Sequence, residues 1–85
     1  MNYLFSKHAL TQIEKRNIHI DWIHDAIKNP EKISIEDNIT VISKFIEIET
    51  KLFLLRIFIN ESVLPHIVIT AYLTSKIEKY YESNL

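Results

Sequence analysis

Residues 39–59 have the sequence ITVISKFIEIETKLFLLRIFI, which is rich in β-branched and aromatic residues and contains neither proline nor glycine. Residues 39–48 follow a period of two, which predicts a β-strand. Residues 51–59 predict a second strand, and its adjacent Leu54 and Leu55 indicate burial on both faces. These two strands form the centre of the expected fold.

The flanking segments add a third strand and two helices. After a loop that contains Pro65, residues 67–73 predict the third strand. On the N-terminal side, apolar residues at helical spacing predict helices near residues 7–16 and 21–28. Residues 1–5 are a candidate for a short strand.

Local signals set the ends of both helices. Ser6 is expected to cap the first helix through its hydroxyl group. Asn17 tolerates the left-handed conformation and can end that helix where no glycine is present. The second helix is expected to end at Asn29-Pro30, because the residue before a proline is pushed out of the helical region.

We therefore expect one α+β domain over residues 1–85, with two N-terminal helices packed on an antiparallel sheet of about four strands. No repeat, low-complexity segment or linker indicates a domain boundary. Residues 74–85 are expected to form a short helix or a flexible tail, because their apolar residues have helical spacing.

Composition excludes several classes of protein. Ten Lys and Arg against eleven Asp and Glu give a net charge of -1, which argues against a histone-like polybasic binder. The absence of cysteine excludes disulfides and thiolate catalysis, and the absence of glycine excludes the glycine-rich nucleotide-binding loops. The N-terminal residues do not resemble a signal peptide and no apolar run is long enough to cross a membrane, so we expect a cytoplasmic location.

Among the four histidines, His8 has the most suggestive position, in the first turn of the first helix. It could serve as a general acid or base near neutral pH, or it could be an ordinary surface or half-buried histidine. His19 and His24 are five residues apart, which is the wrong spacing for a metal shared on one helix face. We expect neither a metal nor a cofactor.

Two cations interrupt apolar strands, Lys44 between Ile42 and Ile46 and Arg56 between Leu54 and Phe58. A charge on an apolar strand face costs desolvation energy unless it is paired or points into a cleft. They could form ion pairs with nearby glutamates or protect an edge strand, or they could bind the phosphate groups of a ligand.

Thr70 and Tyr72 share one face of the third strand, although both are also ordinary strand residues. If the strand cations are functional, Arg56 should project from this same face, and His8 should approach the group. The seven residues between the two strands favour a register in which Arg56 lies opposite Thr70.

The segment FSKHALTQIEKRNIHIDWIHDAIKNPEKI, residues 5–33, resembles a small prokaryotic family known as domain of unknown function 4258. The resemblance extends over nearly the whole chain, with a strand lysine, a strand arginine and a terminal Val-Ile-Thr-x-Tyr motif. One departure is Asn17, where members often have glycine. The residues that carry the resemblance are Ser6, His8, Ala9, Arg16, Ile18, Asn29, Pro30, Lys44, Arg56 and Val68 to Tyr72.

That family resembles the RelE/ParE-like toxins and the wider barnase-like and colicin-like ribonuclease fold. The resemblance implies a bacterial toxin with a cognate antitoxin, a metal-independent endoribonuclease that acts on RNA, either free or on the ribosome. The alternative is a non-catalytic module that binds a partner protein through its strand cations and through apolar groups such as Trp22 and Phe53. The resemblance implies catalytic roles for His8, Arg56, Thr70 and Tyr72, and substrate binding by Arg16 and Lys44.

Overall fold

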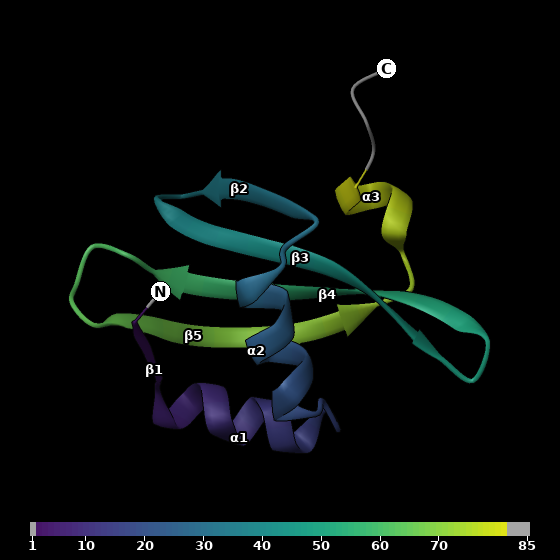
Figure 1. Ribbon diagram of the computed structural model, residues 1–85, viewed down its shortest axis with the longest axis horizontal. Helices are drawn as coiled ribbons and strands as arrows, with labels where there is room; N and C mark the ends of the chain where they lie inside the picture. Colours follow the sequence, from purple (N-terminus) through teal and green to yellow (C-terminus); the bar gives the residue numbers. More distant parts are fainter. Residues whose placement is uncertain (1, 82–85) are drawn as a thin grey trace.

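The fold is known from a computed structural model, which describes residues 2–81 as five strands and three helices (Figure 1). The tail predicted at residues 74–85 contains a short helix, and its residues 82–85 lie outside the described part of the chain. In chain order the elements are β1 (Tyr3–Phe5), α1 (Lys7–Lys15), α2 (Ile20–Lys28), β2 (Lys32–Glu36), β3 (Ile39–Ile48), β4 (Lys51–Asn60), β5 (His66–Thr74) and α3 (Ile77–Tyr81).

The strands form one sheet in the order β1-β5-β4-β3-β2. The predicted α+β class and the three long strands are confirmed, but the sheet has five strands and β1 pairs with β5 in parallel. The candidate strand at residues 1–5 is present as β1, and β2 to β5 are antiparallel as expected. The expectation is wrong in that β1 runs parallel to β5 and in that β2 is a fifth strand. Each edge strand is short, with three residues in β1 and five in β2, so neither gives a long alternating pattern in the sequence.

The predicted ends of the two N-terminal helices are confirmed. The Ser6 hydroxyl accepts a hydrogen bond of 2.9 Å from the Ala9 amide, as an N-cap does. Asn17, with φ of 55°, takes the left-handed conformation after α1. Asn29 follows the last residue of α2 and donates its amide to the Asp25 carbonyl.

The main core lies between the sheet and the helices α1 and α2. Helix α1 runs alongside β5, and α2 crosses the sheet in the region of β3 and β4 (Figure 1). Trp22 of α2, named above as a possible partner-binding group, is half-buried and packs against this core while its ring contacts His19. The buried core residues are Ala9, Ile13, Ile18, Ile23, Ala26, Ile27, Ile42, Leu55, Ile57, Ile59, Val68 and Ala71.

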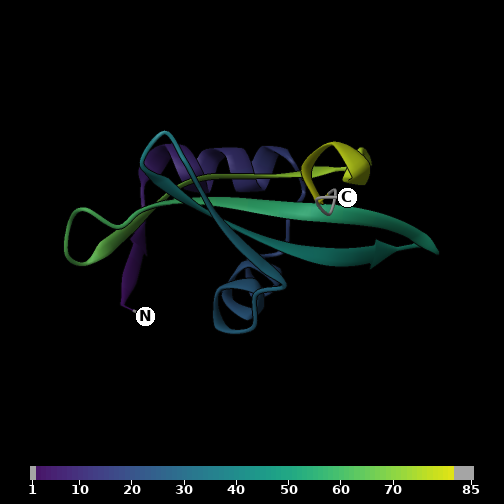
Figure 2. The same ribbon diagram turned by 90° about the horizontal axis from the view of Figure 1, so that it is seen from above.

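Strand β4 is the middle of the sheet, and its two faces differ in chemistry. Leu55 and Ile57 point into the main core, so the alternation of the strand places Arg56 and Phe58 on the opposite face. Helix α3 lies over that opposite face, and Figure 2 shows α2 and α3 on different sides of the sheet. None of the described helices is both long and apolar enough to span a membrane.

The turn at Asn17 gives the first prediction. A side chain with a β-carbon is disfavoured in the left-handed conformation, and a β-branched one most strongly, by roughly 1–2 kcal/mol. We expect Asn17→Val to lower the free energy of unfolding by about 1–2 kcal/mol in urea denaturation, and Asn17→Gly to leave it unchanged or raised. Equal stability of the two variants would contradict the role assigned to this turn.

Candidate functional site

The Arg56 side chain is buried in the face of the sheet that lies under α3. The residue is only 4% exposed, although a guanidinium is costly to remove from water. One terminal nitrogen donates a 2.7 Å hydrogen bond to the Tyr72 hydroxyl, and the other forms an ion pair with Glu36. Arg56 Nε is also buried and has no hydrogen-bond partner among residues 2–81.

Aromatic rings complete the surroundings of this cation. The Tyr80 ring of α3 lies over the guanidinium, with its centre 4.1 Å from Cζ, and the Phe58 ring centre is 5.3 Å away. Such contacts attract a cation through the electron-rich ring face. A 3.1 Å hydrogen bond from Lys32 Nζ to the Tyr80 carbonyl also ties α3 to β2. Burial rather than a lack of donors thus keeps the Arg56 guanidinium from a phosphate. Its ion pair with Glu36 agrees with the ion-pair alternative considered for this cation.

The face predicted for Arg56 is confirmed, but the predicted register is wrong. Arg56 pairs with Tyr72, whereas Thr70 pairs with Phe58. The pairing of Asn60 with Ile67 is already one residue away from the predicted register, and a bulge at Ile69 adds a second residue of shift between Ile59 and Phe58. Thr70 and Tyr72 nevertheless share the Arg56 face, as expected from their spacing.

Arg16 reaches the same group of residues from the end of α1. Its guanidinium donates a 2.9 Å hydrogen bond to the Ala71 carbonyl and a longer one, 3.4 Å, to the Thr70 hydroxyl. The side chain crosses the edge of β5, which β1 pairs only over its first three residues. Arg16 is exposed, so it retains donors that face solvent.

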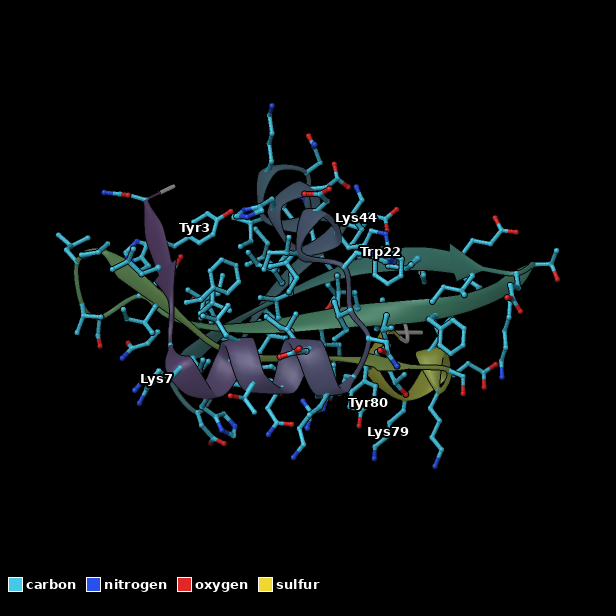
Figure 3. The ribbon with its side chains drawn as sticks, turned by 90° about the horizontal axis from the view of Figure 1, so that it is seen from below. Tyr3, Lys7, Trp22, Lys44, Lys79 and Tyr80 are labelled. Atoms are coloured by element: carbon cyan, nitrogen blue, oxygen red, sulfur yellow. The ribbon has the colours of Figure 1, made fainter. Side chains whose placement is uncertain are left out.

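Lys44 does not belong to this group. It pairs with Leu55, and so it lies on the α2 side of the sheet, opposite to Arg56. Its ammonium group donates a 2.7 Å hydrogen bond to the Asn29 carbonyl and lies 3.5 Å from the Asp25 carboxylate. Figure 3 shows Lys44 beside α2, with Tyr80 on the other side of the strands. Lys44 and Arg56 therefore lie on opposite faces of the sheet and cannot contact one phosphate group together.

His8 is exposed on α1, and no hydrogen bond, ion pair or ring contact joins it to another described residue. The structure does not bring it into contact with Arg56. It does share a row of α1 with Gln12 and Arg16, because positions four residues apart follow one another along a helix face. His8 therefore lies on the side of α1 from which Arg16 contacts Thr70.

Burial and charge shift the ionisation of the two tyrosines beside Arg56. Burial raises the pKa of Tyr72, and the hydrogen bond from Arg56 opposes this shift in part. The pKa of Tyr80 is lowered, first by its hydrogen-bonding interaction with Tyr72 and then by that with Lys79. Tyr72 is thus a neutral phenol at physiological pH and can act as a hydrogen-bond donor.

Sequence reasoning missed Glu36 and Tyr80, two of the groups that surround Arg56. Glu36 stands just before the Asp37-Asn38 turn, and an acidic residue there is unremarkable in a sequence. Its position in the last pair of the β2–β3 hairpin brings it onto the Arg56 face, which only the strand register reveals.

A second polar cluster lies on the other side of the molecule, between β1 and α2. The Tyr3 hydroxyl hydrogen-bonds to Nδ1 of His24, and the Phe5 ring packs edge-on against the same imidazole at 5.7 Å. Burial raises the pKa of Tyr3. These contacts hold α2 against β1. In the part of the chain that the structure describes, no three His, Asp or Glu side chains gather in a way that could hold a metal ion.

A family model described as "Domain of unknown function (DUF4258)" matches residues 5–73. The chain belongs to this family. Comparisons with curated proteins and with solved structures give no match. The DUF4258 segment contains His8, Arg16, Arg56, Thr70 and Tyr72, and it ends before α3 and Tyr80.

The raised pKa of Tyr72 gives the second prediction. The folded protein holds this proton more tightly than the unfolded chain, so its contribution to stability is complete below pH about 10 and is lost as pH rises through the raised pKa. We expect the free energy of unfolding of Tyr72→Phe to fall less above pH about 10 than that of the unmodified protein, in urea denaturation at a series of pH values.

Thr70→Val is the matched control, since it changes the same face and keeps every tyrosine. The free energy of unfolding of Thr70→Val should fall above pH about 10 as much as that of the unmodified protein does. If Tyr72→Phe also follows it, Tyr72 is not the buried phenol described above.

Proposed function

We propose that this DUF4258 domain is a metal-independent endoribonuclease, the toxin of a bacterial toxin–antitoxin pair, with its RNA site on the face formed by β4 and β5. The observation that carries the proposal is a continuous line of polar groups across that face. It runs from Arg16 through the Thr70 hydroxyl to Tyr72 and then to Arg56. Two guanidinium groups and two hydroxyl groups are what a phosphodiester needs for binding and for proton transfer. The resemblance to RelE-like ribonucleases supports the same assignment.

Arg16 is the cation that would contact RNA directly. It is exposed, and a planar guanidinium can donate two parallel hydrogen bonds to phosphate oxygens. Its bonds to Ala71 and Thr70 fix the side chain against β5 before RNA arrives. Such fixing reduces the entropy lost on binding.

Tyr72 would be the proton donor, and Arg56 would position it. The Tyr72 oxygen accepts a hydrogen bond from Arg56, and its own proton, which interacts with the Tyr80 hydroxyl, would turn toward a phosphate oxygen or a leaving oxygen when RNA binds. Arg56 also stabilises negative charge on the phenolic oxygen as that proton leaves. Because Arg56 is buried, it acts through Tyr72 rather than on the phosphate.

The cleavage step is an attack of the RNA 2′-oxygen on the adjacent phosphorus. A bond forms between them, the bond from phosphorus to the 5′-oxygen breaks, and a 2′,3′-cyclic phosphate and a 5′-hydroxyl result. The 2′-hydroxyl gives its proton to a base, for which His8 is the candidate on the same side of α1 as Arg16. The leaving 5′-oxygen takes the Tyr72 proton. No cofactor takes part in this step.

A non-catalytic interaction module is the second candidate, and one observation favours it. The charge of Arg56 is already balanced within the chain by Glu36. A buried arginine with a purely structural role would need the same ion pair, so this contact is expected without any catalysis. On this alternative, the polar face would bind a partner protein and no RNA would be cut. Cleavage itself is therefore the discriminating measurement.

The third prediction tests this directly. Purified protein that has been treated with EDTA and then freed of it should cleave either total RNA or the messenger on translating ribosomes, with cyclic phosphate at the new 3′ ends. Tyr72→Phe and His8→Gln should each slow cleavage by about 100-fold or more, because each removes a proton-transfer group. His19→Gln is the matched control, an exposed histidine on α2, and should cleave at the normal rate.

Urea denaturation of each variant separates lost chemistry from lost folding. If the folded protein leaves both RNA substrates intact, or if Tyr72→Phe cleaves at the normal rate, the ribonuclease assignment at this face is overturned. Growth arrest on expression, relieved by co-expression of a neighbouring small gene product, would test the toxin–antitoxin part of the proposal.

A further inference from the structure

Strand β2 forms one edge of the sheet, and no described strand pairs with its outer side. The two-residue turn Asp37-Asn38, with φ of 51° and 65°, joins it to β3. Hairpins of this kind close on a hydrogen-bonded pair, here Glu36 and Ile39, and such pairs alternate along the ladder. The main-chain groups of alternate β2 residues therefore point away from β3.

The residues with outward main-chain groups are Ile33 and Ile35, and their side chains are also exposed. Ile33 is 59% exposed and Ile35 is 67% exposed. Ile33 pairs with the buried Ile42, so both side chains continue the apolar α2 side of the sheet beyond its covered part. Unpaired edge strands are usually protected by short length, charged side chains, a proline or a bulge. β2 is short and has a charged residue at each end, but it contains no proline and its residues pair with β3 without a shift in register.

The sequence of β2, Lys-Ile-Ser-Ile-Glu, is complementary to itself when two copies run antiparallel. With Ser34 at the centre, Ile33 lies opposite Ile35 of the second copy and Lys32 lies opposite Glu36 of the second copy. Both charged groups also have partners in their own chain, where Lys32 donates to the Tyr80 carbonyl and Glu36, whose side chain is 45% exposed, pairs with Arg56 through one carboxylate oxygen. Unlike charges directly opposite each other stabilise a strand pair, and so do paired β-branched residues.

Other registers are worse. A shift by one residue sets an outward main-chain group opposite an inward one, which breaks the ladder. A shift by two residues sets one isoleucine opposite the acidic Glu31 or Asp37 of the second copy. The Ser34-centred register alone matches both isoleucines and both charges.

We infer that two copies of this chain associate through β2, in antiparallel register about Ser34, so that their sheets become continuous. Each Ile33–Ile35 pair then exchanges both of its main-chain hydrogen bonds, and the four isoleucines pack together. Paired residues point to the same face of a sheet, so both copies present their Arg56 faces on the same side. The inference does not depend on the proposed function, because β2 lies at the edge farthest from β5.

The register can be tested by a cysteine cross-link, since the chain has no cysteine of its own. Ser34 would face Ser34 of the second copy in a non-hydrogen-bonded pair, with a Cα separation of about 4.5 Å that a disulfide can bridge. We expect oxidised Ser34→Cys to run as a dimer that reductant dissociates. Ser62→Cys, in the exposed β4–β5 loop, is the matched control and should remain monomeric.

Association without a cross-link should be weak and concentration-dependent, because one strand edge buries less area than a standard interface. In sedimentation velocity from micromolar to near-millimolar protein, we expect a shift from monomer to dimer. Ile35→Pro should abolish the shift, because it removes an outward amide and leaves the β2–β3 ladder intact. Leu10→Lys, which changes an exposed apolar residue on α1, should dimerise normally.

Circular dichroism confirms that each variant is folded, and Ile35→Lys gives a second disruption that does not constrain the main chain. A protein that stays monomeric at every concentration overturns the inference. So does a dimer that persists in both Ile35 variants, or one in which Ser34→Cys cross-links no faster than Ser62→Cys.

Discussion

A guanidinium group that leaves water must replace its hydration with hydrogen bonds and charge from the fold. Arg56, in the central strand β4, obtains these from Glu36 of β2, Tyr72 of β5 and the Tyr80 ring of α3. One buried side chain thus joins three elements that are distant in the sequence. The main core on the other side of the sheet is apolar, so the arrangement of the α3 side depends on satisfying this cation.

The two edges of the sheet differ in how far other residues cover them. Beyond the three residues paired with β1, the edge of β5 is covered by α1 and its flanking residues. The Ser6 amide donates to the Val68 carbonyl, the Ser6 hydroxyl donates to the Ile69 carbonyl, and Arg16 donates to the Ala71 carbonyl. Each of these three carbonyls along the edge therefore accepts a hydrogen bond. The edge at β2 has no such cover among the described residues, and this contrast makes β2 a natural place for a second chain.

Local chemistry made the helix ends predictable. The Ser6 cap, the left-handed Asn17 and the Asn29-Pro30 stop each depend on one residue and its neighbours, and the long strands depend on a period of two. The register of the strands, and so the sheet face on which each side chain lies, was harder to predict. Glu49 and Thr50 form the β3–β4 turn with φ of 49° and 68°. Neither Glu nor Thr favours the left-handed conformation, so the sequence does not predict this turn. That turn fixes the register of β3 against β4, and so it decides that Lys44 lies on the face opposite to Arg56.

The bulge at Ile69 likewise made the register between β4 and β5 hard to predict from the sequence. An extra residue in β5 leaves no mark in the alternation of the sequence, yet it moves the partner of Arg56 from Ala71, which the pairing of Asn60 with Ile67 alone would give, to Tyr72. This shift changes the chemistry of the face. A phenol directly opposite a buried guanidinium is polarised by it, whereas a threonine in that place would offer a weaker acid and no ring.

The charge of the face follows from the same contacts. Glu36 balances Arg56, so the positive charge that RNA would meet comes from cations at the edges of the face, such as the exposed Arg16 beside β5 and the exposed Lys79 beside Tyr80. With a net charge of -1, the chain has no large basic surface to hold a nucleic acid by charge alone. An RNA bound here would have to be held by a few directed hydrogen bonds from Arg16, Thr70 and Tyr72 and by contact with aromatic rings. Such binding depends on geometry more than on salt, and the fixed side chains along β5 supply that geometry.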